Sequence, residues 1–135
     1  KTDFKIRTSY AAGIINSDEQ HKLEFITNIV DNDYTVCMRG GGNYSIRFYE
    51  TLCLGRIPIF INTDCILPFE EKINWKDICI WIEVDQISYI SEIILESHQS
   101  MTQSQFSEKQ VYCRELWLKY FSKEGFYNQF HGYLQ

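Results

Sequence analysis

The sequence predicts an α/β fold in which a parallel β-sheet is flanked by helices. Three apolar runs rich in β-branched and aromatic residues, at residues 34–38, 57–61 and 78–82, have the composition of buried strands. A helical stretch at residues 45–54 separates the first two runs and ends at Gly55. Continuous apolar runs of this kind are typical of parallel strands that are covered on both faces. With 135 residues, 44% of them hydrophobic, the chain is long enough to bury a core.

The first element is expected to be a helix over about residues 17–31. Ser17 and Gln20 have the spacing of a capping box, in which two side chains satisfy free backbone amides at a helix start. Apolar residues then recur at helical spacing, at Leu23, Ile26, Ile29 and Val30. The polar run Asp31-Asn32-Asp33 is expected to end this helix before the first strand.

The rest of the chain is predicted to contain an irregular crossover and a helical C-terminal third. Residues 62–77 include Pro68 and a short turn at residues 69–71 but no full helix. After Asp85, a predicted N-cap, the apolar spacing indicates a helix to about residue 98, and a second helix follows over about 103–121. No internal repeat or linker divides the chain, so we predict that residues 1–135 form a single domain.

A glycine run that follows one strand and precedes a helix is the segment most suited to bind a ligand. Glycines at positions 40–42 let a phosphate approach the backbone, and the free amides and dipole of the following helix attract an anion. Arg39 and Arg47 bracket this loop, and arginine meets phosphate oxygens in a two-pronged way. Glu50 lies almost one helical turn after Arg47, where its carboxylate could accept hydrogen bonds from ribose hydroxyls. We therefore expect a pyrophosphate-containing ligand.

Plainer interpretations of the same residues stay open. Glycines between a strand and a helix are common in ordinary turns, and Arg47 with Glu50 could form only a surface ion pair. The third glycine of the G-x-G-x-x-G fingerprint is absent and no G-K-[ST] sequence follows the run. A dinucleotide-dependent oxidoreductase and a P-loop enzyme are therefore disfavoured.

Charge, hydropathy and cysteine content exclude several other classes. The net charge of −5 disfavours a nucleic-acid partner, and no apolar run is long enough for a membrane span. The five cysteines form no C-x-x-C pair, so we expect buried, reduced thiols. Asn43-Tyr44-Ser45 is a formal glycosylation sequon inside the expected ligand loop, where a glycan would block it. These features favour the cytoplasm, with the Golgi lumen as the alternative if the full protein has a membrane anchor.

No metal or other cofactor is expected. Asp31 and Asp33 have the D-x-D form of a metal motif, but they end a helix, so a solvated turn explains them better. The histidines at positions 21, 98 and 131 have no carboxylate or cysteine at ligand spacing, and we assign them no role.

A long, ordered series of motifs resembles the exostosin-type glycosyltransferases. The series is RGGGNYSIRFYETLCLGRIPIFINTDCILPF, residues 39–69, followed by INWKDICIWIE, residues 73–83. It matches R-G, S-x-R-x-x-E-x-L, G-x-I-P-x-x-I, L-P-F and an acidic or amide residue before tryptophan, and the resemblance covers about residues 34–95. The resemblance implies the GT-B architecture of two Rossmann-like halves, of which the C-terminal half holds the nucleoside-diphosphate sugar. This chain would be that half, and the N-terminal acceptor half would be missing from it.

The resemblance also implies roles for individual residues. The residues that would border the nucleotide sugar are Arg39, Gly40, Gly41, Gly42, Asn43, Ser45, Arg47, Glu50, Asn62 and Asp64. Among them, Arg47 would neutralise the diphosphate, Glu50 would hold the ribose, and residues 62–64 would approach the sugar beyond a strand end. The sequence departs from the family pattern in its three consecutive glycines and in having Asn74, where aspartate is frequent, before Trp75.

The implied reaction is transfer with inversion, in which an acceptor hydroxyl of a glycan attacks the anomeric carbon of the donor. The base that removes its proton is not identified, and Asp64 is a candidate beside a capping or core role. A non-catalytic nucleotide- or anion-binding module and an unrelated α/β interaction domain are the alternatives. The C-terminal aromatics are expected mostly in the core, with part of the cluster at an interdomain surface.

Overall fold

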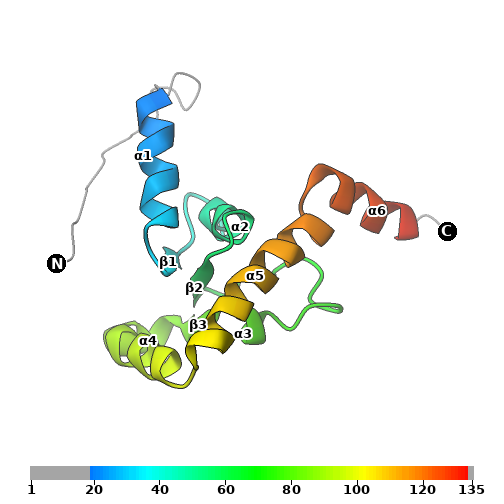
Figure 1. Ribbon diagram of the computed structural model, residues 1–135. Coiled ribbons are helices and arrows are strands. Elements are labelled where there is room, and N and C mark those ends of the chain that lie inside the picture. Colours follow the sequence, from blue (N-terminus) through cyan, green and yellow to red (C-terminus); the bar gives the residue numbers. More distant parts are fainter. Residues whose placement is uncertain (1–18, 134–135) are drawn as a thin grey trace.

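The computed structural model describes residues 19–133, which form a three-stranded parallel sheet flanked by helices (Figure 1). In chain order the elements are α1 (Glu19–Val30), β1 (Tyr34–Cys37), α2 (Ile46–Cys53), β2 (Ile57–Asn62), α3 (Trp75–Ile78), β3 (Ile80–Glu83), the 3₁₀-helix η2 (Val84–Tyr89), α4 (Ile90–Gln99), α5 (Gln103–Tyr120) and α6 (Lys123–Tyr133). The predicted α/β class is confirmed. The predicted capping residue Ser17 lies outside the described residues.

The sheet has the strand order β1-β2-β3, and both neighbouring pairs are parallel. Val36 pairs with Ile59, which pairs with Ile80, so the central strand β2 aligns the other two. All residues of β2 but its last are buried, as its continuous apolar sequence predicts. The third strand begins at Ile80, two residues later than predicted, because Ile78 belongs to the short helix α3.

Helices cover the two faces of the sheet to different extents. The larger core lies on the face covered by α2 and α5, where Phe48 packs against the rings of Phe60 and Trp75. On the other face, Ile80 and the neighbouring strand isoleucines pack against isoleucines of α4. Figure 1 shows α5 running across the sheet and α6 continuing beyond it. Each face thus receives the apolar cover that a parallel sheet requires.

Helix α2 begins and ends where the sequence predicts. Ser45 is its N-cap residue, and Gly55 after its C-terminus has φ of 63°, a left-handed conformation that glycine adopts without strain. Arg114 of α5 donates to the Cys53 carbonyl at this end. Where α5 gives way to α6, a Cβ on Gly125 would lie 2.2 Å from the Leu118 carbonyl oxygen, so only glycine lets the start of α6 approach the last turn of α5 this closely.

Two expectations need correction. Asp85 is not an N-cap, because residues 84–89 form a 3₁₀-helix with Glu83 at its N-cap position, and Tyr89 precedes α4. The five cysteines are free, but Cys53 and Cys65 are only half-buried, because Cys53 ends α2 and Cys65 lies in the loop after β2.

Candidate functional site

The carboxyl ends of the three parallel strands meet at one edge of the sheet, where the predicted ligand residues are found. β1 ends at Cys37 before the glycine loop, and β2 and β3 end side by side at Asn62 and Glu83. In open parallel sheets, ligands bind outside this edge, because the loops there lead into helix N-termini. The glycine loop leads directly into α2 in this way.

The glycine loop is closed by one backbone hydrogen bond and leaves its first two glycines open. The Gly40 amide donates to the Tyr44 carbonyl at 3.1 Å. A Cβ on Gly40 or Gly41 would meet nothing within 4 Å, and neither glycine has a left-handed φ. A Cβ on Gly42, in contrast, would lie 2.5 Å from the ring of Tyr44. The ring of the exposed Tyr44 therefore covers Gly42, while the backbone at positions 40 and 41 is open to a ligand.

The two predicted side chains of α2 are half-buried beside the loop. The guanidinium carbon of Arg47 lies 4.6 Å from the ring centroid of Phe25 in α1. Burial raises the pKa of the Glu50 carboxyl above its ordinary value, and the positive charge of Arg47 opposes that shift. Within the described residues Arg47 contacts Phe25 and makes no ion pair with Glu50 inside 4.0 Å. Arg39 is exposed at the start of the loop.

Asn43 joins the glycine loop to the segment that follows β2. Its side-chain nitrogen donates to the carbonyls of Thr63 at 3.0 Å and Asp64 at 3.2 Å, and the Thr63 hydroxyl donates to its oxygen at 2.6 Å. Asp64 is exposed and has φ of 58°, a left-handed conformation that aspartate tolerates better than most residues. The side chain of Asn43 is thus occupied within the protein.

Asn62 is likewise bonded within the protein, to the last residue of β3. Its Nδ2 donates to Glu83 Oε2 at 2.6 Å, and its Oδ1 accepts from the Cys65 amide at 3.4 Å. Hydrogen bonds from Asn62 and Trp81 lower the pKa of the Glu83 carboxyl below its ordinary value. Of the ten predicted residues, Asn43, Asn62 and Asp64 are each held at this edge by the hydrogen bonds just described. Arg39 and the three glycines lie in the loop that follows β1, Ser45 is buried at the start of α2, and Arg47 and Glu50 lie within that helix.

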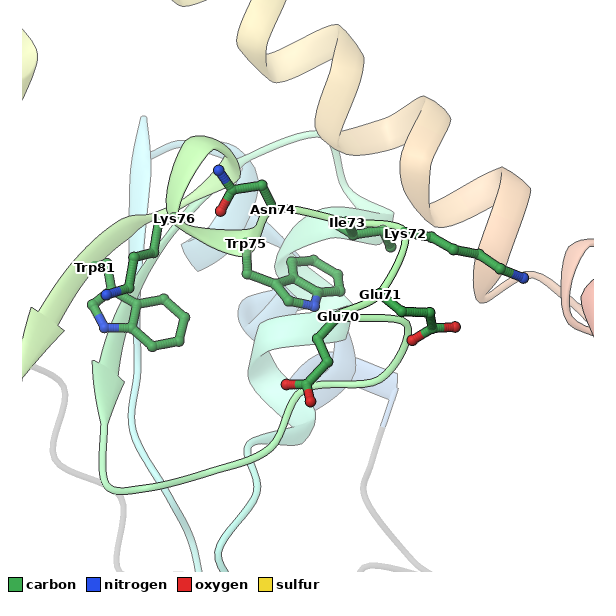
Figure 2. A pocket seen from close by; sticks show the side chains of 8 residues that line it. All are labelled: Glu70, Glu71, Lys72, Ile73, Asn74, Trp75, Lys76 and Trp81. Atoms are coloured by element: carbon green, nitrogen blue, oxygen red, sulfur yellow. The ribbon is translucent and has the colours of Figure 1, made fainter.

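Two surface hollows lie elsewhere. The first, of about 470 Å³, is lined by residues 70–76 and Trp81, and Figure 2 shows the Trp75 and Trp81 rings on two of its sides. Trp75 is buried, and the Lys76 ammonium lies 5.4 Å from the centroid of the Trp81 ring. The second, of about 440 Å³, includes Asp33, Tyr34 and His98. Neither hollow includes the glycine loop, which lies open at the sheet edge.

The described residues contain no group of three or more histidine, cysteine, aspartate or glutamate side chains that could hold a metal ion. Asp31 and Asp33 lie in the exposed turn that ends α1, as predicted. His98 Nδ1 lies 2.8 Å from the hydroxyl of Tyr34. His21 has a side chain that the structure does not describe, so nothing is added to its prediction.

Sequence reasoning missed two neighbours of the predicted site residues, Phe25 beside Arg47 and Glu83 beside Asn62. Glu83 could have been found, because it ends the third strand as Asn62 ends the second, and parallel strand ends meet. The contact of Phe25 with Arg47 left no local signal, because the two residues belong to different helices.

The fold and the loop at its carboxyl edge define a Rossmann-type α/β fragment. The exostosin GT47 domain matches residues 5–97 of the sequence. The chain belongs to the exostosin GT47 family.

Named relatives of the chain include exostosins and a probable xylosyltransferase. It is 27% identical to Exostosin-1 of Drosophila melanogaster over 103 residues, which are 76% of this chain and 13% of that protein. It is 30% identical to the Exostosin-1 homolog of Caenorhabditis elegans over 98 residues, 72% of this chain and 26% of that protein. It is 27% identical over 75 residues, 56% of this chain and 18% of that protein, to the probable beta-1,4-xylosyltransferase IRX10L of Arabidopsis thaliana. The chain therefore spans about an eighth to a quarter of these relatives.

Among the described residues, no helix combines the length and the apolar character needed to cross a membrane.

Proposed function

We propose that this chain holds the nucleoside-diphosphate sugar donor of an exostosin-type glycosyltransferase. The observation that carries the proposal is the open backbone of Gly40 and Gly41, directly before α2 at the carboxyl edge of the sheet. Free amides at a helix start and the positive end of its dipole stabilise a diphosphate there. The chain's relatives include a probable xylosyltransferase and a probable glucuronosyltransferase, which supports sugar transfer as the chemistry.

In this proposal the residues of the loop and of α2 divide the donor between them. Arg39 and Arg47 neutralise the diphosphate, with Ser45 and the amides of the glycine loop beside it. Glu50 accepts hydrogen bonds from the ribose hydroxyls, because it lies one turn further into the helix than the phosphates. Asn43, Asn62 and Asp64 border the sugar end. Asn43 and Asn62 act there through the loops that they hold, since their side chains are already bonded.

The proposed reaction is transfer with inversion to a hydroxyl of a glycan acceptor. The acceptor oxygen attacks the anomeric carbon as the bond to the diphosphate oxygen breaks, and cationic groups stabilise the negative charge on the leaving diphosphate. A base removes the proton from the acceptor hydroxyl. Asp64 is a candidate, because it is exposed beyond the end of β2. Otherwise the base belongs to a second, acceptor-binding half that faces this one across a cleft.

Exposed aromatic residues on α6 give that second half a place to pack. Phe126, Tyr127 and Phe130 are each at least half exposed, whereas Tyr120 belongs to the core.

For localisation, the five free thiols favour a reducing cytoplasm, and a Golgi-lumen protein would need a membrane anchor outside these residues.

Calorimetric titration of the chain with uridine diphosphate, guanosine diphosphate and inorganic phosphate tests the proposal. Diphosphate binding that inorganic phosphate does not reproduce supports it, and absence of binding to either diphosphate rejects it. Binding is expected to persist in EDTA, because the proposal uses no metal. If EDTA abolishes binding and Mg²⁺ or Mn²⁺ restores it, Asp31 and Asp33 become candidate metal ligands. We expect no sugar transfer by the isolated 135 residues. A non-catalytic nucleotide-binding module would show the same binding, and is distinguished by inactivity of the full reading frame.

A further inference from the structure

Glu83 is the residue at which two strand ends and a neighbouring helix come together. It pairs in register with Asn62, so that β2 and β3 end opposite each other. Asn62 Nδ2 donates to Glu83 Oε2 at 2.6 Å, and Trp81 Nε1 donates to Oε1 at 2.8 Å. Lys76 Nζ lies 3.9 Å from the same Oε1 atom, and Figure 2 shows Lys76 beside the Trp81 ring. Both carboxylate oxygens therefore accept a hydrogen bond.

The carboxylate of Glu83 determines which way the Asn62 amide points. An ionised carboxylate can only accept hydrogen bonds, so the nitrogen of the Asn62 amide must face it. The amide oxygen then points the other way, where it accepts from the Cys65 backbone amide at 3.4 Å. Glu83 thereby holds one side of the tight segment between Asn62 and Cys65.

That tight segment in turn holds the glycine loop. Its two central residues, Thr63 and Asp64, supply the two carbonyls and the hydroxyl that bind both ends of the Asn43 amide, at 2.6–3.2 Å. Asn43 directly follows the glycine run. A continuous series of hydrogen bonds and short chain segments therefore leads from Glu83 on β3, through the end of β2, to the loop after β1.

We propose that Glu83 is a positioning residue for the glycine loop. It holds Asn62 and the segment after β2, and through them it sets the position of Asn43 and of the loop amides. Its consequence for ligand binding rests on the proposed function, in which those amides meet the diphosphate. Glu83 itself does not contact that ligand. It acts through its bond to Asn62 and through the bonds between residues 63–64 and Asn43.

The chemistry of the pair allows a sharp test by exchange of donor and acceptor. Glu83→Gln leaves one oxygen for two donors, so either the Asn62 or the Trp81 bond is lost. Asn62→Asp alone places two carboxylates against each other. The double variant Asn62→Asp with Glu83→Gln restores the bond in the opposite direction, because the new amide donates to the new carboxylate. The amide oxygen of the new glutamine at position 83 still accepts from Trp81, and the new carboxylate at position 62 still accepts from the Cys65 amide.

The primary measurement is the NMR spectrum of the ligand-free chain. We expect Glu83→Gln to shift the backbone amides of Gly40–Gly42 and the side-chain amide of Asn43, and the double variant to bring them back towards the wild-type positions. A purely local role at the end of β3 would move the Trp81 indole signal and leave the glycine loop unchanged. That outcome overturns the proposal. Glu70→Gln, which alters an exposed carboxylate on the neighbouring turn, is the matched control and should leave the loop signals in place.

Binding of uridine diphosphate measured on the same proteins separates this inference from the proposed function. We expect Glu83→Gln to raise Kd about five- to tenfold, the effect of one lost hydrogen bond, and the double variant to recover most of the loss. If the wild-type chain binds no diphosphate, the proposed function fails, and the loop signals alone decide whether Glu83 positions the loop. If it binds and Glu83→Gln has the wild-type Kd with unmoved loop signals, the inference fails and the proposed function stands.

Discussion

Arg47 of α2 rests on the ring of Phe25 of α1, with its guanidinium carbon 4.6 Å from the ring centroid. The contact is one of the few that tie α1 to the rest of the fold, beside the hydrogen bonds from Arg56 to the Val30 carbonyl at 2.8 and 3.2 Å. A guanidinium held against an aromatic face loses less freedom when it binds a phosphate, because its orientation is already restricted. Helix α1 therefore contacts a residue of the candidate site although it carries no predicted ligand residue.

Replacing Phe25 should weaken anion binding through Arg47. Phe25→Leu removes the ring face while keeping an apolar side chain, and a cation–π contact at a partly exposed site contributes about 0.5–1 kcal/mol, so the Kd for pyrophosphate should rise about two- to fivefold. Phe25→Tyr keeps the ring and serves as the control with unchanged affinity. Arg47→Ala should weaken pyrophosphate and uridine diphosphate alike. Identical Kd values for Phe25→Leu and wild type in calorimetry would show that the ring does not orient the Arg47 guanidinium for phosphate binding.

Glu50→Ala should weaken nucleoside diphosphate while leaving pyrophosphate nearly unaffected. The carboxylate lies one turn beyond the start of α2 and is proposed to meet ribose, which pyrophosphate lacks. A hydrogen bond to a charged group contributes about 1.5–3 kcal/mol, so uridine diphosphate affinity should fall roughly ten- to hundredfold. The two ligands are titrated against the folded variant, with circular dichroism as the check of folding. Equal weakening of both ligands would make Glu50 a structural partner of Arg47.

Glu50 should also make stability depend on pH. Burial raises its folded pKa above the ordinary value of about 4.5, so ionisation costs stability as the pH rises from the unfolded pKa through the raised folded pKa. Glu50→Gln, which cannot ionise, should therefore gain in Tm over wild type as the pH increases through that window, and the gain should level off above it. Thermal unfolding from pH 4 to pH 8 measures the difference. Glu70→Gln controls for the general loss of one negative charge, and a Tm difference independent of pH would contradict the assignment.

Much of the fold could be predicted because its signals are local. The apolar run of β2 predicts a buried strand, and the glycine after α2 predicts the end of that helix. The start of β3 was misplaced because Ile78 is as apolar as a strand residue, yet its main chain continues α3. Asp85 was misassigned because an acidic residue before an apolar spacing fits an α-helix and a 3₁₀-helix equally well, and hydrogen bonding decides between them.

The position of the glycine loop between β1 and α2 was predictable, but the hydrogen bonds around it were not. A glycine run between a strand and a helix indicates the carboxyl edge of a parallel sheet wherever it occurs. That Asn43 would bond to Thr63, and Asn62 to Glu83, depends on the strand register, which pairs residues about 20 positions apart. Both asparagines remain predicted site residues, and each bonds to two other residues.

Thr35→Val should stabilise the chain. The Thr35 hydroxyl is buried in β1 without a hydrogen-bond partner among the described residues, and an unpaired buried hydroxyl costs about 1–3 kcal/mol. Valine keeps nearly the same shape, so urea unfolding should give a higher free energy of unfolding by about 1 kcal/mol. Thr51→Val is the matched control, because the Thr51 hydroxyl donates to the Arg47 carbonyl at 2.7 Å, and it should destabilise. A loss of stability in Thr35→Val would reveal a partner for its hydroxyl.

Gly41→Ala should separate ligand binding from folding. Gly41 has no left-handed φ and a Cβ there would meet nothing within 4 Å, so the folded chain should tolerate alanine and gain about 0.4–1 kcal/mol from a stiffer unfolded state. The same methyl group would stand between the loop amides and a diphosphate, and losing a charged hydrogen bond should raise the pyrophosphate Kd at least about tenfold. Gly132→Ala in α6, equally open, is the control and should leave binding unchanged. Wild-type pyrophosphate affinity in Gly41→Ala would show that the open glycine loop is an ordinary turn.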